Sequence, residues 1–101
     1  MATVRVVDVG GIDLGPSGNI HIHVDPRPDI PFGAFVQLMV KPIPSGQSGE
    51  GDGGVVRAAN FKGQLVIDPT TLQPTIRWHW DLINESNIPM KTEAFLLVVT
   101  N

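Results

Sequence analysis

The chain has 101 residues and a formal net charge of −3; 42% of its residues are hydrophobic and 17% are charged. This length fits a single domain spanning residues 1–101, and the absence of cysteine excludes disulfides, zinc–thiolate sites and cysteine nucleophiles. The seven Lys and Arg residues are scattered along the chain, so the sequence predicts no nucleic-acid partner.

Two further patterns bear on localisation. The first residues lack the basic and apolar regions of a signal peptide, and the longest apolar run, residues 94–99, is too short to span a bilayer. We therefore expect cytoplasmic synthesis without a signal peptide, and no membrane partner. Export by a route that needs no signal peptide, or assembly into a particle, stays open.

Clusters of glycine and proline divide the chain into short segments with the patterns of strands, and none shows helical periodicity. Strands are expected at 3–9, 19–24, 33–41, 55–68, 75–83 and 92–100, where 55–68 is one bent strand or two short ones with a bulge or turn near Asn60. Gly10 and Gly11 form a turn after the first strand, the proline-rich stretch 25–31 is an extended connection, and residues 42–54 are a flexible glycine-rich loop. The sequence thus predicts an all-β fold: a single-domain antiparallel β-sandwich, immunoglobulin-like or jelly-roll-like, with six to seven short strands.

Alternation within these strands predicts the core, because successive side chains of a strand point to opposite sides. In 75–83 the apolar residues, both tryptophans among them, share one face, and the polar residues share the other. The same reasoning applied to 19–24 and 33–41 completes the predicted core: Ile20, Ile22, Val24, Val36, Leu38, Ile76, Trp78, Trp80 and Leu82.

The histidines of the chain all fall on polar faces of predicted strands. His21 and His23 are two residues apart, so their side chains leave the same face, and His79 joins them if the second and fifth strands are neighbours. Three imidazoles with an open position are typical of a zinc site, and copper also accepts imidazole. Asp25 and Asp81 are candidates for a further ligand or for a hydrogen-bond acceptor that orients a ring. The simpler interpretation is a solvated strand face with no cofactor.

Two strands are apolar on both faces. Phe35 and Met39 lie opposite Val36 and Leu38, and the last strand has the continuous apolar run 95–99. A sheet in a two-layer fold buries one face, so the second apolar face needs its own cover. That cover is either a loop, such as the proline-rich stretch 25–31, or another subunit, and the low charge of the chain favours another subunit. The predicted interface residues are Phe35, Met39, Phe95, Leu97 and Val99.

The sequence contains no complete catalytic motif, which favours a non-enzymatic function. The first interpretation is a binding or structural module that forms homo-oligomers or packs into a larger assembly, such as a virion, tail, filament or lectin-like subunit. The alternative is a metal-binding protein or a metal-dependent hydrolase that uses the three histidines with zinc or copper. A carbohydrate partner is a third interpretation, which the aliphatic neighbours of Trp78 and Trp80 disfavour.

Overall fold

The computed structural model describes residues 2–43 and 54–101. Most of the predicted loop 42–54 therefore lies outside the described residues. The described part of the chain forms six strands and contains no helix. The strands are β1 (Thr3–Leu14), β2 (Asn19–Val24), β3 (Phe35–Ile43), β4 (Val56–Ile67), β5 (Pro74–Asn84) and β6 (Met90–Thr100). Within residues 2–43 and 54–101, no helix could cross a membrane.

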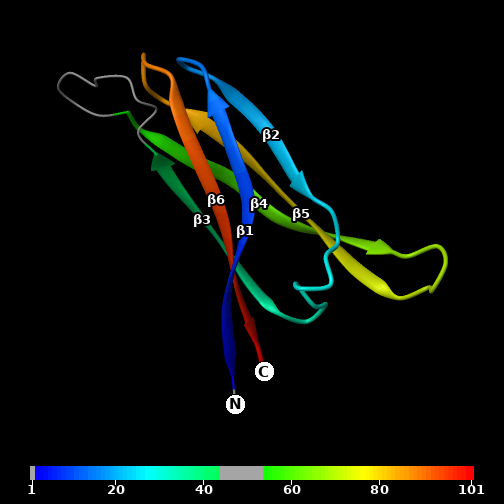
Figure 1. Cartoon of the computed structure of the whole chain (residues 1–101). Helices are drawn as coiled ribbons and strands as arrows, with labels where there is room; N and C mark the ends of the chain where they lie inside the picture. The colour runs from blue at the N-terminus through cyan, green and yellow to red at the C-terminus, as the bar shows by residue number, and fades with distance from the viewer. Residues whose placement is uncertain (1, 44–53) are drawn as a thin grey trace.

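The strands form two three-stranded antiparallel sheets, which confirms the all-β prediction. The first sheet has the order β1-β6-β3 and the second has the order β2-β5-β4. In Figure 1 the two sheets overlap near one end of the molecule and diverge toward the other. The β4–β5 hairpin extends to the right, away from the two chain ends.

Strand β1 is longer than predicted because the glycine pair does not end it. The register with β6 shifts between Asp8 and Gly10, and pairing then resumes as far as Leu14. Gly10 has a φ of 110°, a conformation that favours glycine, and its N–H donates to Asp8 Oδ1 at 2.8 Å. The predicted turn at Gly10 and Gly11 is therefore a β-bulge inside a continuous strand.

Strand β4 has a second bulge, close to the predicted position. The register with β5 shifts between Ala59 and Lys62, and Asn60 has a φ of 57°. The extra residue turns Phe61 toward the interior, where its ring stacks on Trp78 with 5.3 Å between ring centroids. The remaining strand boundaries differ from the predictions by two residues or fewer, and β2 has the predicted bounds.

The core lies between the facing apolar sides of the two sheets. One buried cluster contains Trp80 and Leu82 of β5, and the other contains Leu96 and Val98 of β6. Phe61 and Trp78 pack against both clusters and connect them. The predicted core residues Ile22, Val24, Val36 and Leu38 are partly buried against these clusters.

Two predicted core residues lie at the margins. Ile20 pairs opposite the buried Leu82, yet it is 38% exposed because β2 is an edge strand with a neighbour on one side only. Ile76 is half-buried in the part of the β4–β5 hairpin that extends beyond the core.

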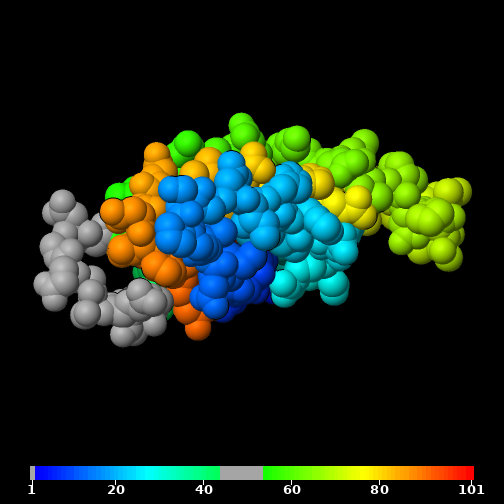
Figure 2. Space-filling view, turned by 90° about the horizontal axis from the view of Figure 1, so that it is seen from above, coloured from blue at the N-terminus to red at the C-terminus, as the bar shows by residue number. Residues whose placement is uncertain are grey.

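This extending part of the hairpin, residues 65–76, is named here the β4–β5 overhang. Leu65 and Ile67 lie on the same side of β4 as Phe61, which packs in the core. In the overhang this side is largely uncovered, so Leu65 and Ile67 remain 63% and 51% exposed. Figure 2 shows the tip of the overhang projecting from the rest of the molecule. A pocket of about 350 Å³ separates it from the proline-rich connection, with Pro28, Phe32 and Ile76 in its lining.

Candidate functional site

The pairing of β2 with β5 brings the three histidines onto one outer face. His23 lies directly opposite His79, and His21 lies directly opposite Asp81. Paired residues of antiparallel strands point to the same side of a sheet. The imidazoles of His21, His23 and His79 therefore gather on the outer face of the second sheet, and the indoles of Trp78 and Trp80 lie on its inner face.

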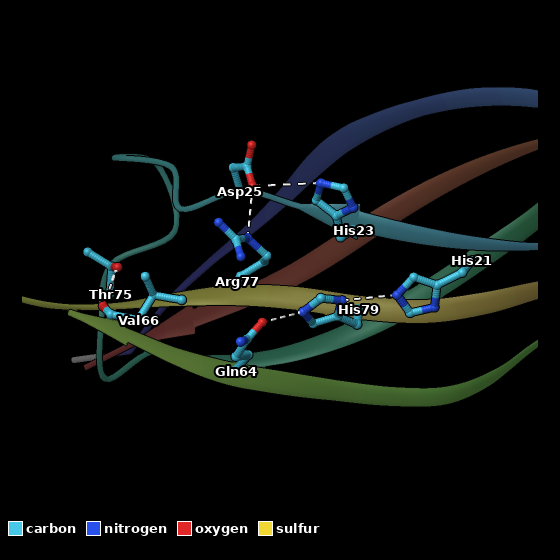
Figure 3. A network of polar contacts seen from close by, with 8 residues as sticks. All are labelled: His21, His23, Asp25, Gln64, Val66, Thr75, Arg77 and His79. Carbon is cyan, nitrogen blue, oxygen red and sulfur yellow. Dashed lines mark hydrogen bonds and ion pairs between the residues drawn. The ribbon is translucent and has the colours of Figure 1, made fainter. Parts of the chain in front are cut away.

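A chain of hydrogen bonds runs across this face. The Nδ1–H of His21 donates to Asp81 Oδ1 at 2.9 Å, and His21 Nε2 lies 3.1 Å from His79 Nδ1. The Nε2–H of His79 donates to Gln64 Oε1 at 2.7 Å. Figure 3 shows the His79 ring between the His21 ring and the side-chain amide of Gln64. Asn60 completes the chain by donating from Nδ2 to Asp81 Oδ2 at 2.8 Å. These residues are named here the histidine network.

His23 is placed beside this chain and makes a looser contact. Its ring centroid is 6.0 Å from that of His79, and its Nε2 is 3.8 Å from Asp25 Oδ1. Asp25 is held by Arg77, whose Nε–H donates to the same carboxylate oxygen at 2.9 Å (Figure 3). The two candidate carboxylates therefore have different partners: Asp81 contacts His21, and Asp25 contacts Arg77 and His23.

The electrostatics of the histidine network favour a charged carboxylate and a neutral ring. Hydrogen bonds from Asn60 and His21 hold the pKa of Asp81 below its ordinary value. Partial desolvation lowers the pKa of His79, and the neighbouring charge of a protonated His21 or of Lys62 lowers it further. Asp81 is thus an anionic acceptor, and His79 resists protonation.

Three members of the histidine network and its surroundings were not foreseen: Asn60, Gln64 and Arg77. Asn60 and Gln64 come from β4, and the β4 bulge decides which of its side chains share a face with His79. A bulge of this kind has only a weak sequence signal, here the Ala-Ala-Asn stretch. In residues 2–43 and 54–101, no group of three or more His, Cys, Asp or Glu side chains is arranged to hold a metal ion.

The outer face of the first sheet is the second candidate site. Cross-strand pairing places Phe35 beside Val99 and Met39 beside Phe95, with Leu97 between the two pairs on β6. On the other side of β6, Val4 pairs with Val99 and Val6 pairs with Leu97. Val4 and Val6 were missed, although alternation in 3–9 places them together. These seven residues are named here the outer apolar face: Val4, Val6, Phe35, Met39, Phe95, Leu97 and Val99.

Comparisons with models of known protein families, with curated proteins and with solved structures found no match.

Proposed function

We propose that this protein is a non-enzymatic module that associates with a second copy of itself through the outer apolar face. The observation that carries the proposal is the exposure of large apolar side chains gathered on one side of the first sheet. Phe35 is 78% exposed, and Val4 and Val6 are 60% and 58% exposed. Contiguous exposed apolar patches of about 300–600 Å² on protein surfaces are often functional.

Strand β6 supports this proposal because it is apolar on both sides. Its inner side is buried in the core through Ala94, Leu96 and Val98. Its outer side has Phe95 and Leu97, only partly covered by the neighbouring strands. Burial of this outer side contributes a favourable hydrophobic term of about 25 cal/mol for each Å² of apolar surface removed from water, which offsets part of the entropy lost on association.

The distribution of charge on the first sheet favours a second copy as the partner. Toward one end of the outer face, Lys41 pairs opposite Glu93 and Asp13 pairs opposite Lys91, so positive and negative groups already alternate there. Asp8 is the charged residue beside the apolar end, opposite Phe95. A face with an apolar part at one end and balanced charges at the other is compatible with its own copy across a two-fold axis.

We further propose that the two sheets form a β-sandwich of the jelly-roll type. The pairing is nested, since β1 pairs with β6 in one sheet and β2 pairs with β5 in the other. A long hairpin folded over so that successive pairs alternate between two sheets has the connectivity of a jelly roll. An immunoglobulin-like domain groups its strands differently, and the order β1-β6-β3 with β2-β5-β4 favours the first class.

Sedimentation velocity over a range of micromolar concentrations tests the self-association. We expect a dimer or larger species for the parent protein and a monomer for Phe35→Lys. Phe35 is mostly exposed, so its replacement should leave the thermal unfolding temperature of the monomer unchanged. Leu65→Lys on the β4–β5 overhang is the matched control, because Leu65 is an apolar residue outside the proposed face that is also mostly exposed, at 63%.

The outcomes separate the two apolar surfaces. Retention of the assembly by Leu65→Lys and its loss in Phe35→Lys support the proposal. A parent protein that stays monomeric, or an assembly that survives Phe35→Lys, contradicts it.

A further inference from the structure

The diagonal pair of His21 and His79 is the closest contact between titratable rings on the second sheet. Their ring centroids are 5.2 Å apart with an interplanar angle of 27°, and His21 Nε2 is 3.1 Å from His79 Nδ1. The outward nitrogen of each ring is engaged elsewhere: His21 Nδ1 with Asp81 and His79 Nε2 with Gln64 (Figure 3 for the latter).

The three contacts in this series of hydrogen bonds need three hydrogens, but two neutral imidazole rings supply only two. A neutral imidazole has one N–H donor and one acceptor nitrogen. With the Gln64 amide oriented as in the structure, Asp81 Oδ1 and Gln64 Oε1 are both acceptors, so each neutral ring uses its single hydrogen outward. The two inner nitrogens, 3.1 Å apart, then each carry a lone pair, a contact that a shared proton or a metal ion bound to both nitrogens would stabilise.

We propose that His21 Nε2 and His79 Nδ1 chelate a divalent transition-metal ion of the class that prefers imidazole, Cu²⁺ or Zn²⁺. With metal–nitrogen bonds of about 2.0–2.1 Å, the 3.1 Å separation corresponds to a nitrogen–metal–nitrogen angle of about 95–100°. This angle lies between the square and tetrahedral arrangements that these two ions adopt. Such a site needs two protein ligands, with water in the other positions, so it requires no third side chain.

The partners of the outward nitrogens match those of histidines that bind metals. A metal-binding histidine usually donates its other N–H to a carboxylate or a carbonyl oxygen, which fixes the ring and its tautomer. His21 donates to the carboxylate of Asp81, and His79 donates to the amide oxygen of Gln64. Asn60 in turn holds Asp81 through its second carboxylate oxygen. Both rings are therefore oriented with an unprotonated nitrogen toward the proposed ion.

The charges around the two rings set the expected strength of binding. Asp81 contributes a negative charge next to His21, whereas Lys62 pairs opposite His79 and Arg77 lies two residues from it on the same face. Asp25 partly neutralises Arg77. Because Lys62 repels a cation, we expect weaker binding than in closed sites with four protein ligands.

Isothermal titration of the purified, metal-free protein with Cu²⁺ and then with Zn²⁺ tests this site. We expect one ion per chain, with Cu²⁺ bound more tightly than Zn²⁺. His21→Ala and His79→Ala should each weaken Cu²⁺ binding about tenfold or more. His23→Ala is the matched control, because it removes an imidazole from the same face that lies beside His79 but makes no hydrogen bond to either ring of the proposed pair, and it should retain the parent affinity.

A proton shared by His21 and His79 would compete with the metal ion for the same two nitrogens. Nitrogen chemical shifts of the imidazoles in the metal-free protein show whether that proton is present. The proposal is overturned by any of three results: no stoichiometric ion, an equal loss of affinity in His23→Ala, or an imidazolium shared by His21 and His79 at neutral pH that excess Cu²⁺ does not displace. The far-ultraviolet spectrum and unfolding temperature of each metal-free variant check that it folds.

Discussion

Asn84 joins three segments of the chain at one end of the molecule. It is 1% exposed, and its Nδ2 group donates to the carbonyl oxygens of Gly15 at 3.0 Å and Ile88 at 2.8 Å, with Leu14 at 3.4 Å. Its Oδ1 accepts from the Ser86 N–H at 2.9 Å. A buried amide with such partners orders the turn after β1 and the loop before β6 together.

Replacement of this side chain should therefore destabilise the fold. We expect Asn84→Ala to lower the free energy of unfolding by about 1–3 kcal/mol, because it removes a buried side chain and leaves the partly buried carbonyl groups that it bonds without a donor. Urea unfolding followed by tryptophan fluorescence measures the change. Asn87→Ala, an exposed asparagine in the same loop, is the control and should change the stability little. Equal stabilities for the two variants would contradict the role assigned to Asn84.

Arg27 and Asp29 form a two-pronged ion pair within the proline-rich connection. The Nε–H and Nη2–H of Arg27 donate to the two carboxylate oxygens of Asp29 at 2.9 and 2.8 Å. The carbonyl oxygen of Asp29 also accepts from Arg5, so the connection is tied to β1. These bonds explain why a stretch with three prolines has a defined conformation without belonging to a sheet.

The same pair predicts a pH dependence. The hydrogen bonds from Arg27 hold the pKa of Asp29 below its ordinary value of 3.8. A carboxyl whose pKa is lower in the folded state stabilises the fold above its unfolded pKa, and this contribution is lost as the pH falls through the folded pKa. Arg27→Gln should raise the pKa of Asp29, which a carbon-13 NMR titration of the carboxyl measures. Arg57→Gln, which removes the Arg57–Glu85 pair, should leave that pKa where it is.

At the scale of elements, the conformation of β4 depends on a close contact between its Gly63 and the ring of Trp78 on β5. Gly63 lies opposite Trp78, and a Cβ at this position would be 2.9 Å from the Trp78 ring and 3.1 Å from Ile76. The ring of Trp78 occupies the space above the glycine and reaches Phe61. The strand therefore needs glycine here to let the tryptophan join both buried clusters.

Gly63→Ala should consequently strain the junction between β4 and β5. We expect a loss of about 1–3 kcal/mol of stability from overpacking, since the neighbouring atoms belong to a large ring that cannot move aside freely. Thermal unfolding, with the near-ultraviolet spectrum as a report on the indoles, measures the effect. Gly15→Ala is the matched control because a Cβ there meets open space. A loss of the same size in both variants would remove the explanation by contact with Trp78.

At the scale of the whole molecule, local pattern was sufficient for some features and insufficient for others. Alternation correctly separated His79 from Trp78 and Trp80, because the direction of a side chain depends only on its place within its own strand. The pairing of β2 with β5 joins residues about sixty positions apart, and no local pattern encodes which strands become neighbours. The contact of His79 with His21 depends on that pairing, whereas its contact with Gln64 depends on the pairing of β4 with β5 and on the β4 bulge.

Bulges and edges account for most of the remaining differences. Gly10 and Gly11 have the composition of a turn, and only pairing with β6 keeps β1 extended through them. Ile20 satisfies the apolar alternation of its strand, yet the edge position of β2 leaves it exposed. The burial of a residue depends on the strands beside it and on the sheet that faces it, and the alternation of its own strand gives no information about either.

The β4–β5 overhang determines where the molecule should first unfold locally. Its backbone bonds link only two strands, and Leu65 and Ile67 contribute little buried surface to hold them in place. Local opening should begin there, because its free energy is lowest where few apolar contacts must break. Deuterium uptake should therefore be fast at the amides of 66 and 75 and slow at those of 80 and 82 on the same ribbon. Uniform protection along β5 would show that the hairpin unfolds only together with the core.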